Sequence, residues 1–486
     1  MASRMAQAVM AAIGVLGAFY TADAMRHRAS AHVEVSSSST PRDDRPGGFT
    51  RWGLWGAGHR AVSANAAVAT AGLPGTEFRT ADPSTALAAS AMGGAGTGTT
   101  TAAAAPATPV NYSFGAPVRV PLGGLDMRSL AVRDVTGDGR KDIILSLSSE
   151  DGTGRLAAVI EQTPGGALAP PRILATTGAS DNPGLAIGDI DGDHVNDIVI
   201  GHRGGVTAFN SRNGFAGARA HGAGDAEYLA VLDINRDGRK DVFTQSWTDG
   251  GELFLGDGRG GMLPAQAVET SATGANTMMS GELTGDGIAD LLLASTHGEQ
   301  LGFWIYPGQR AGGFGAPVFH AVTSRAAAGP EAATIGDFNG DGRADVALAH
   351  GWTRPEAAIV VKFQQADGSF GPEKVIPVFD GPDGLATADI DGNGLDDIVV
   401  SHGGFSTLGY LLQSGAGLGA QVRVSMPMTI WSSPRSDGVA VGDVNGDRCE
   451  DIVVANSLND LVVLHGQNCL PPKPPMSRPL PAMAAD

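Results

Sequence analysis

The sequence predicts an all-β fold, a β-propeller in which each repeat forms one four-stranded antiparallel blade. Two observations carry this prediction. A nine-residue acidic motif recurs seven times, at intervals of 44 to 55 residues. Around each copy, short apolar segments alternate with Gly-rich turns, and long helical periodicity is absent.

The chain begins with a segment that has the composition of an export signal. Arg4 precedes an apolar run from Ala8 to Tyr20, and small residues follow. These 13 apolar residues are too few to span a bilayer, which needs about 20. We therefore expect residues 1–24 to be a signal peptide and the protein to be exported, that is, secreted, periplasmic or held at the cell surface.

Two segments with few large apolar side chains flank the repeats. Residues 25–110 are mostly Ala, Ser, Thr and Gly and are expected to form a flexible linker. Residues 471–486 are Pro-rich and are expected to be an extended tail. The propeller should therefore occupy residues 111–470. The net charge is −18 with no basic stripe, so no nucleic-acid partner is expected. No transmembrane segment is expected either, and we expect a monomer.

Each repeat shows the same order of elements, as in the second copy. An alternating apolar segment, "GLAIGD" (184–189), leads into the acidic motif, and "DIVIG" (197–201) follows it. A third strand-like segment, "GVTAFN" (205–210), ends in the Gly/Phe turn "NGFAGA" (213–218). A fourth strand then leads to the next repeat. Four short strands in about 50 residues are typical of a propeller blade.

These repeats resemble the FG-GAP/VCBS repeat, the blade of the integrin α-subunit propeller and of many bacterial exported proteins. The resemblance extends from Phe114 to Cys469 and rests on the acidic motif in seven copies, with Gly/Phe turns such as "GGFGAP" and "GSFGPE" between them. That family forms seven-bladed propellers, so the resemblance implies seven blades, one for each motif.

The ends of the repeat region predict how the ring closes. The segment "FGAPVRVPLG" (114–123) has the pattern of an outer strand with no inner strands before it, and the last repeat lacks its fourth strand. We expect the N-terminal strand to complete the last blade, which removes an exposed sheet edge. Cys449, in the last acidic loop, and Cys469, after the third strand, are expected to form a disulfide across this blade. Such a bridge contributes roughly 3 kcal/mol for a loop of about 20 residues.

The acidic motifs are predicted to be calcium-binding loops between the first and second strands. Positions 1, 3, 5 and 9 carry Asp, Asn, Thr or Glu, and alternate side chains of a tight loop can converge on one centre. Hard oxygen donors in this number suit Ca²⁺, whereas Zn²⁺ favours Cys and His and Mg²⁺ retains its waters. An EF-hand does not fit, because position 12 is aliphatic and a strand follows the loop.

In the resembling family, position 7 adds its backbone carbonyl to these side chains. The expected ligands for up to seven Ca²⁺ ions are Asp134, Thr136, Asp138, Arg140 and Asp142; Asp189, Asp191, Asp193, Val195 and Asp197; Asp233, Asn235, Asp237, Arg239 and Asp241; Glu282, Thr284, Asp286, Ile288 and Asp290; Asp337, Asn339, Asp341, Arg343 and Asp345; Asp389, Asp391, Asn393, Leu395 and Asp397; and Asp443, Asn445, Asp447, Cys449 and Asp451.

The seven loops are not expected to bind equally. The loop that starts at Asp189 has four carboxylates, whereas Thr136 and Thr284 make the first and fourth loops the weakest. At position 6, glycine normally permits a left-handed backbone. His194 and Arg448 occupy this position in the second and seventh loops, which puts the geometry of those two loops in question.

The face opposite the acidic loops carries the residues expected to meet a ligand. In three copies a histidine stands five residues after the closing aspartate, with Arg and aromatic residues nearby. The candidates are His202, Arg203, Trp247, His350, Trp352, His402, Phe405 and Trp431. Such a set suits a sugar or an extended polymer, through stacking and hydrogen bonds. The open alternative is that each histidine ends a strand and bonds the neighbouring blade.

We therefore expect a non-enzymatic, calcium-stabilised module for recognition or adhesion, with an extracellular glycan or protein surface as its ligand. One alternative is a calcium-propeller polysaccharide lyase, with one of the three histidines as base and Tyr228 or Tyr410 as acid. The sequence has no G-x-S-x-G or His-Glu-x-x-His motif. A second alternative is a structural scaffold of the cell envelope.

Overall fold

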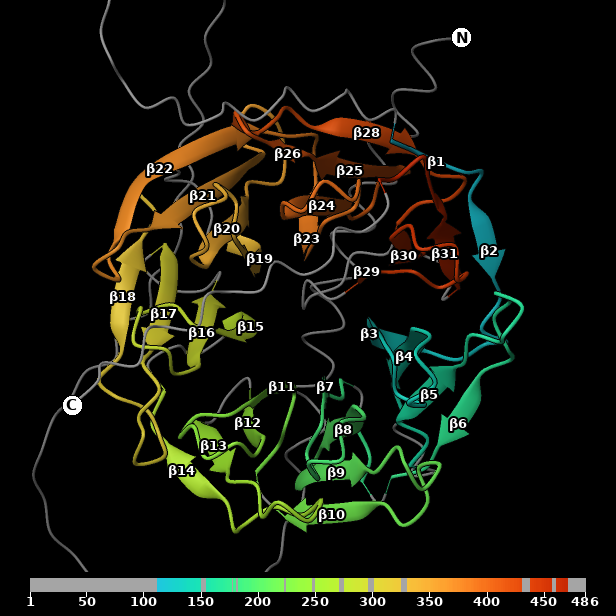
Figure 1. Ribbon diagram of the computed structural model, residues 1–486, viewed down its shortest axis with the longest axis vertical. Helices are drawn as coiled ribbons and strands as arrows, with labels where there is room; N and C mark the ends of the chain where they lie inside the picture. Colours follow the sequence, from blue (N-terminus) through green and yellow to red (C-terminus); the bar gives the residue numbers. More distant parts are fainter. Residues whose placement is uncertain are drawn as a thin grey trace, which may run out of the picture. The chain divides into compact units, whose positions relative to one another are not determined.

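The computed structural model describes residues 112–470 except for 150–153, 177, 181, 223, 247–249, 271–274, 296–300, 325–329, 431–437 and 457–459. Within these residues the regular structure is β-strand alone, and seven antiparallel four-stranded sheets stand as blades around a central channel (Figure 1). The predicted seven-bladed all-β propeller is therefore confirmed. The same residues include no helix long and apolar enough to cross a membrane. The expected signal peptide, linker and tail lie outside the described residues.

In each of the first four blades the strands follow one another from the channel outward. Blade 1 contains β3 (Met127–Arg133), β4 (Asp142–Leu147), β5 (Ala157–Ile160) and β6 (Arg172–Leu174). Blade 2 contains β7 (Leu185–Gly188), β8 (Asp197–His202), β9 (Gly205–Phe209) and β10 (Arg219–Gly222). Blade 3 contains β11 (Tyr228–Leu232), β12 (Asp241–Gln245), β13 (Gly251–Phe254) and β14 (Gln266–Val268). Blade 4 contains β15 (Ala275–Gly281), β16 (Asp290–Ser295), β17 (Gly302–Tyr306) and β18 (Val318–Ala321).

Blades 5 and 6 keep this order, whereas the outer strand of blade 7 comes from the N-terminal side. Two extra strand pairs accompany blades 6 and 7. Blade 5 contains β19 (Pro330–Gly336), β20 (Asp345–His350), β21 (Ala358–Gln364) and β22 (Phe370–Pro377). Blade 6 contains β23 (Pro382–Ala388), β24 (Asp397–His402), β25 (Thr407–Leu411) and β28 (Val422–Ser425), with a small hairpin of β26 (Gln413–Ser414) and β27 (Gly417–Leu418). Blade 7 contains β29 (Val439–Gly442), β30 (Asp451–Ala455), β31 (Leu461–Leu464) and β2 (Val118–Val120), and beside it β1 (Ser113–Phe114) pairs with β32 (Gly466–Gln467).

The hydrophobic core is divided among the interfaces between neighbouring blades. The second strands are apolar runs, such as "DIVV" at the start of β24, because both faces of each sheet are covered by other blades. Each of the seven core clusters draws its residues from two adjacent blades. In one of them, Ile143 of blade 1 packs in the same cluster as Val453 of blade 7. The core is therefore a closed ring of interfaces.

The ring closes as the sequence predicts, with strand β2 from the N-terminal side as the outer strand of blade 7. The carboxylate of Asp460, which directly precedes β31, fastens this strand. It accepts hydrogen bonds from Arg119 Nε at 2.6 Å and from the backbone N–H of Leu122 at 2.9 Å. Within the same blade, a disulfide joins Cys449 to Cys469. The closing blade is therefore held by an ion pair and a covalent bond in addition to its strand pairing.

We expect Asp460→Ala to lower the free energy of unfolding by about 2–3 kcal/mol, because Asp460 is 5% exposed and its removal leaves the Leu122 N–H without an acceptor. Denaturant unfolding at pH 7 measures this loss. Glu161→Ala is the control, since Glu161 faces Arg172 at 3.7 Å and both side chains are largely exposed. Glu161→Ala should lower the free energy of unfolding by less than about 1 kcal/mol. Equal losses in the two variants would contradict a closing role for Asp460.

Candidate functional site

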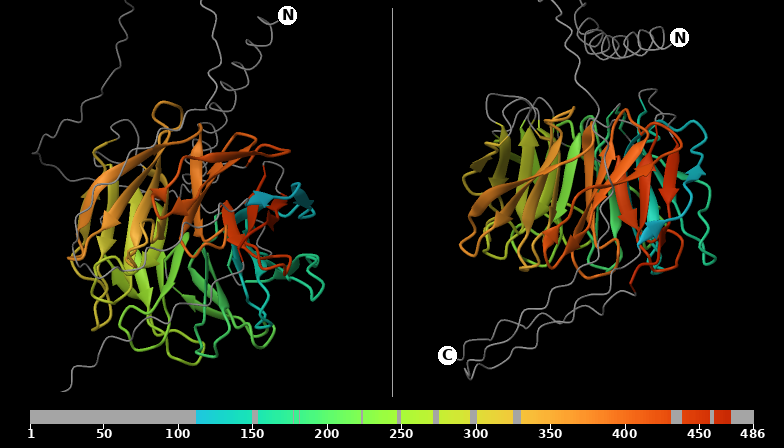
Figure 2. Two further views of the ribbon diagram at one scale, coloured as in Figure 1. Left: turned by 45° about the horizontal axis from the view of Figure 1, so that its top comes forward. Right: turned by 90° about the horizontal axis from the view of Figure 1, so that it is seen from above.

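The seven acidic loops share one face of the propeller, called the acidic face from here on. Each connects the innermost strand of a blade to its second strand, as residues 134–142 connect β3 to β4. The connections from the second to the third strands lie at the other ends of these antiparallel strands, on the opposite face. Figure 2 shows the strands running between the two faces.

The aspartate at position 9 holds two parts of each blade together. In blade 6, Asp397 accepts hydrogen bonds from the backbone N–H of Ile390, within the loop, at 3.0 Å and from that of Gln413, after the third strand, at 2.7 Å. The same two bonds recur in every blade, through Asp142, Asp197, Asp241, Asp290, Asp345 and Asp451. All seven side chains are buried. Sequence reasoning considered this residue only as a metal ligand and missed its structural role.

The side chain at position 1 accepts hydrogen bonds from the backbone of its own loop. Asp189 accepts them from the N–H groups of Gly192, Asp193 and His194, at 2.7 to 3.0 Å. The bond to position 6 requires a left-handed backbone there, and His194 adopts it with a φ of 70°. Arg448 does the same with a φ of 73°. The loop geometry is therefore kept in both copies that lack glycine.

In two loops three carboxylates converge closely enough to hold one metal ion. One oxygen from each of Asp189, Asp191 and Asp197 lies within 4.8 Å of the others. The second group consists of Asp389, Asp391 and Asp397. In this second group, Oδ1 of Asp389 is buried and accepts no hydrogen bond. A buried carboxylate oxygen without a donor is costly unless a cation or proton approaches it, so this donor set fits a hard divalent cation.

In three other loops the chain itself places a positive charge beside the acidic residues. The guanidinium of Arg140, at position 7, contacts the carboxylate of Asp138 and donates from Nε to the carbonyl of Gln162 at 2.9 Å. Arg343 makes the same two kinds of contact in the fifth loop, and Arg239 lies 3.9 Å from Asp237 in the third. The two convergent loops carry Val195 and Leu395 at position 7, although Arg212 Nε lies 3.2 Å from Asp193 in the second loop. These two have no guanidinium from position 7 to offset their carboxylates.

Burial raises the pKa of the position-9 carboxyls. The pKa is raised to about 8 for Asp397, to about 7 for Asp345 and to about 6 for Asp197. Loss of hydration is the largest cause in each case, and the neighbouring aspartates raise the pKa further, whereas the two backbone hydrogen bonds lower it. Without a cation, these groups therefore bind protons more tightly than in the unfolded chain.

The three histidines predicted for the opposite face are buried, with exposures of 5% for His202 and 0% for His350 and His402. His202 bonds the hydroxyl of Thr207 in the next strand at 3.0 Å. His402 bonds the carbonyl of Asp380, in the connection from blade 5, at 3.0 Å. His402 thus follows the alternative reading, in which a histidine ends a strand and bonds the neighbouring blade.

The other predicted residues differ in their exposure. Trp352 is 44% exposed, Arg203 is exposed and Phe405 is half-buried. Trp247 and Trp431 lie outside the described residues. The tyrosines considered as catalytic acids, Tyr228 and Tyr410, are buried at 6% and 7% exposure. The structure therefore places neither these tyrosines nor the three histidines on an open surface.

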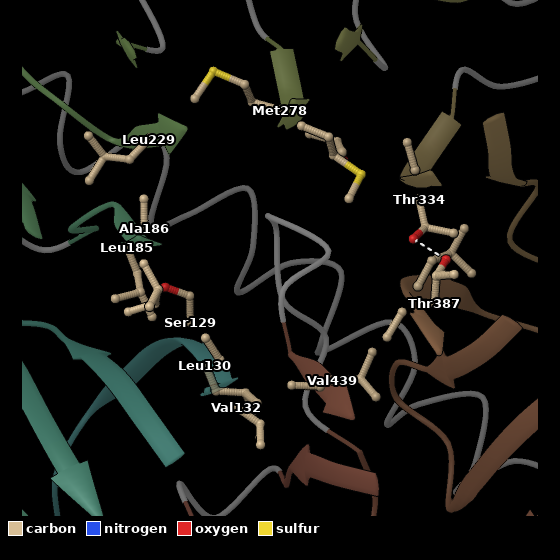
Figure 3. A pocket seen from close by; sticks show the side chains of 18 of the residues that line it. Ser129, Leu130, Val132, Leu185, Ala186, Leu229, Met278, Thr334, Thr387 and Val439 are labelled. Atoms are coloured by element: carbon tan, nitrogen blue, oxygen red, sulfur yellow. Dashed lines mark hydrogen bonds between the residues drawn. The ribbon is translucent and has the colours of Figure 1, made fainter. Parts of the chain in front are cut away.

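The central channel is lined by both apolar and polar residues, among them Arg133, Glu227 and Thr277. It has a volume of about 430 Å³ and is lined by the innermost strands, with aliphatic side chains such as Leu130, Leu229 and Met278 (Figure 3). Thr334 and Thr387 form a hydrogen bond of 2.7 Å with each other across its wall. The exposed polar and aromatic groups of the opposite face are a separate set of candidates for ligand contact.

Comparison with known proteins finds a match to one repeat family and to solved structures. The model of the FG-GAP-like repeat matches residues 282–348, which begin at the fourth acidic loop and end within β20. No curated protein matches the chain. A lectin of Agrocybe aegerita that recognises non-reducing terminal N-acetylglucosamine is 18% identical over 69% of this chain and 87% of its own, with a TM-score of 0.49. BBS1N in its complex with ARL6DN is 10% identical over 74% of this chain and 97% of its own, with TM-scores of 0.47 and 0.48 in mercury-soaked and lead-soaked crystals.

We expect His194→Gly to stabilise the protein by up to about 1 kcal/mol. A left-handed conformation costs a non-glycine residue about 1–2 kcal/mol, and part of this gain is lost because glycine is more flexible when unfolded. The His194 side chain is 98% exposed, so its loss removes no packing. Thermal unfolding measures the change. Gly192→Ala is the reciprocal control, since Gly192 has a φ of 79° and should lose stability. A lower melting temperature for His194→Gly would contradict the argument.

We expect the stability of the chelator-treated protein to fall as the pH rises from about 4 to 8. In this window Asp345 and Asp397 hold protons in the folded state that they have released in the unfolded state, because burial raises each pKa. Their ionisation at higher pH therefore opposes folding. Denaturant unfolding at several pH values measures the slope, and the same series with millimolar Ca²⁺ is the control. A stability that rises with pH in the chelator would contradict this assignment.

Proposed function

Because residues 282–348 match the FG-GAP-like repeat and the described residues fold as a seven-bladed propeller, we propose that the protein is an exported, calcium-binding recognition module. Its acidic face holds Ca²⁺, and its opposite face contacts a glycan or a protein. The observation that carries the calcium assignment is the convergence of three carboxylates in each of two loops, at Asp189 and Asp389. Oxygen donors in this number suit Ca²⁺.

When bound, Ca²⁺ would supply positive charge to loops whose carboxylates repel one another. The side chains of Asp389, Asp391 and Asp397 would hold it in blade 6, and Asp189, Asp191 and Asp197 in blade 2. Position 9 keeps its two backbone bonds, because each carboxylate oxygen has a second lone pair. The loops at Asp134 and Glu282, with threonine at position 3, would bind more weakly.

Export is supported by two features of different kinds. The disulfide between Cys449 and Cys469 is of a kind that persists in oxidising compartments. The composition of residues 1–24 is that of a signal peptide. Calcium is abundant in such compartments, where sites with modest affinity are filled. Export, disulfide and calcium therefore form one consistent proposal.

A recognition role fits the distribution of chemical groups better than catalysis does. The buried histidines and tyrosines are engaged with the protein's own strands, whereas Trp352 and several arginines reach the surface. Flat aromatic surfaces and guanidinium groups bind sugars and polar polymers without reacting with them. A panel of glycans and extracellular proteins, tested with the full-length protein in Ca²⁺, examines this role. Failure to bind anything on either panel would leave only the scaffold alternative.

We expect chelation to lower the melting temperature by several degrees and Ca²⁺ to restore it, because a ligand that binds only the folded state stabilises it. The double variant Asp191→Asn/Asp391→Asn should lose most of this calcium-dependent shift. Differential scanning calorimetry with and without chelator measures it. Glu269→Gln is the matched control, because it removes an exposed carboxylate that lies outside the loops. An unchanged melting temperature after chelation would remove the calcium assignment.

A further inference from the structure

A cluster of aromatic and arginine side chains lies between blades 5 and 6 on the opposite face. It consists of Trp352 and Arg354 from the β20–β21 connection, Phe379 and Asp380 from the connection between the blades, and Arg423 on β28; it is called the arginine–aromatic cluster below. The guanidinium carbons of Arg354 and Arg423 each lie 4.9 Å from the centroid of the Phe379 ring. Two guanidinium groups from different blades thus contact the same aromatic ring.

The two arginines of the cluster differ in their partners. Arg354 donates to both carboxylate oxygens of Asp380, from Nε at 3.0 Å and from an Nη at 3.1 Å. Arg423 forms no hydrogen bond or ion pair with any residue that the structure describes, and its side chain is exposed. The cluster therefore carries one uncompensated positive charge, on a chain whose net charge is −18.

Part-buried hydrogen bonds connect Phe379 and Asp380 of the cluster to Gln421 and His402. The side chain of Gln421 accepts a hydrogen bond from the backbone N–H of Phe379 at 2.8 Å and donates one to Nε2 of His402, also at 2.8 Å. Nδ1 of His402 then donates to the carbonyl of Asp380 at 3.0 Å. Since burial lowers the pKa of His402 to about 4, the ring stays neutral and keeps this arrangement at neutral pH. The arginines are thus presented on a rigid support.

Trp352 adds an exposed aromatic side chain on the segment that carries Arg354. Its indole is 44% exposed, and its carbonyl accepts a hydrogen bond of 2.6 Å from the N–H of Gly381. The segment that carries Trp352 and Arg354 is therefore tied to the segment that carries Phe379 and Asp380. An exposed indole, a free guanidinium and a fixed carboxylate suit a ligand with an apolar ring face, an anionic group and hydroxyl groups.

We propose that the arginine–aromatic cluster binds a carboxylated sugar unit of an extracellular polysaccharide. Arg423 would pair with the sugar carboxylate, Trp352 would stack on the apolar face of the ring, and Asp380 would accept hydrogen bonds from ring hydroxyls. This proposal rests on the recognition function proposed above and names its ligand class. It assigns His402 and Gln421 a positioning role.

The test measures binding of the full-length protein to a uronic-acid hexasaccharide and to the same oligosaccharide after reduction of its carboxyl groups. We expect the acidic form to bind at least tenfold more tightly, and added salt to weaken it. Arg423→Gln and Trp352→Ala should each reduce binding of the acidic form about tenfold or more, without lowering the melting temperature by more than a degree or two. Arg310→Gln, which removes an exposed arginine in blade 4, is the charge-matched control and should have no effect.

Four results would overturn the proposal in distinguishable ways. Equal binding of the acidic and reduced forms, with only Trp352→Ala impaired, would keep glycan recognition but remove the carboxylate. Equal competition by poly-glutamate would reassign the cluster to acidic proteins. Binding of other glycans that is insensitive to both cluster variants would place the ligand elsewhere, whereas no glycan binding at all would also remove the glycan form of the proposed function.

Discussion

The buried carboxylate at position 9 is the interaction on which this propeller depends. In each blade it connects the loop between the first two strands to the end of the third strand, through two backbone N–H groups, as Asp397 does with Ile390 and Gln413. Two neutral donors do not fully replace the water that an ionised carboxylate loses. This incomplete replacement of hydration raises the pKa of these carboxyl groups. If these loops bind a cation as proposed, fold stability and cation binding would be coupled at the same carboxylates.

Much of the architecture could be predicted because the same pattern of strands and turns occurs in every repeat. The seven copies of the motif, with the resemblance to the FG-GAP/VCBS repeat, implied seven blades, and an outer strand without inner strands predicted the ring closure that β2 provides. The structural role of position 9 could not be predicted. An aspartate that bonds backbone N–H groups and one that binds a metal have the same pattern in a sequence. The left-handed backbone of His194 also required the structure, because its cause is a hydrogen bond to Asp189.

The candidate ligand site was only partly predictable, since it is assembled from separate blades. The sequence-based candidates included Trp352, which is exposed, but also His402, which is buried. Sequence reasoning missed Phe379 and Arg423 altogether. The only available signal was composition, an Arg and a Phe near turns, and this is common. Phe379 and Arg423 are in contact because the connection after β22 crosses to blade 6 beside β28. A sequence pattern does not show this crossing.

The ring of shared core clusters has a consequence for the order in which the protein can be made. Strand β2 is among the first strands to be synthesised, yet its partner β31 is among the last, with Val118 opposite Val463. Until β31 is available, β2 has no sheet to join, and the cluster between blades 1 and 7 lacks residues such as Leu461 and Val463. Contacts this distant in sequence form slowly. The chain must therefore keep an early strand unpaired through nearly its whole synthesis, and a truncated product would display open edges at both ends.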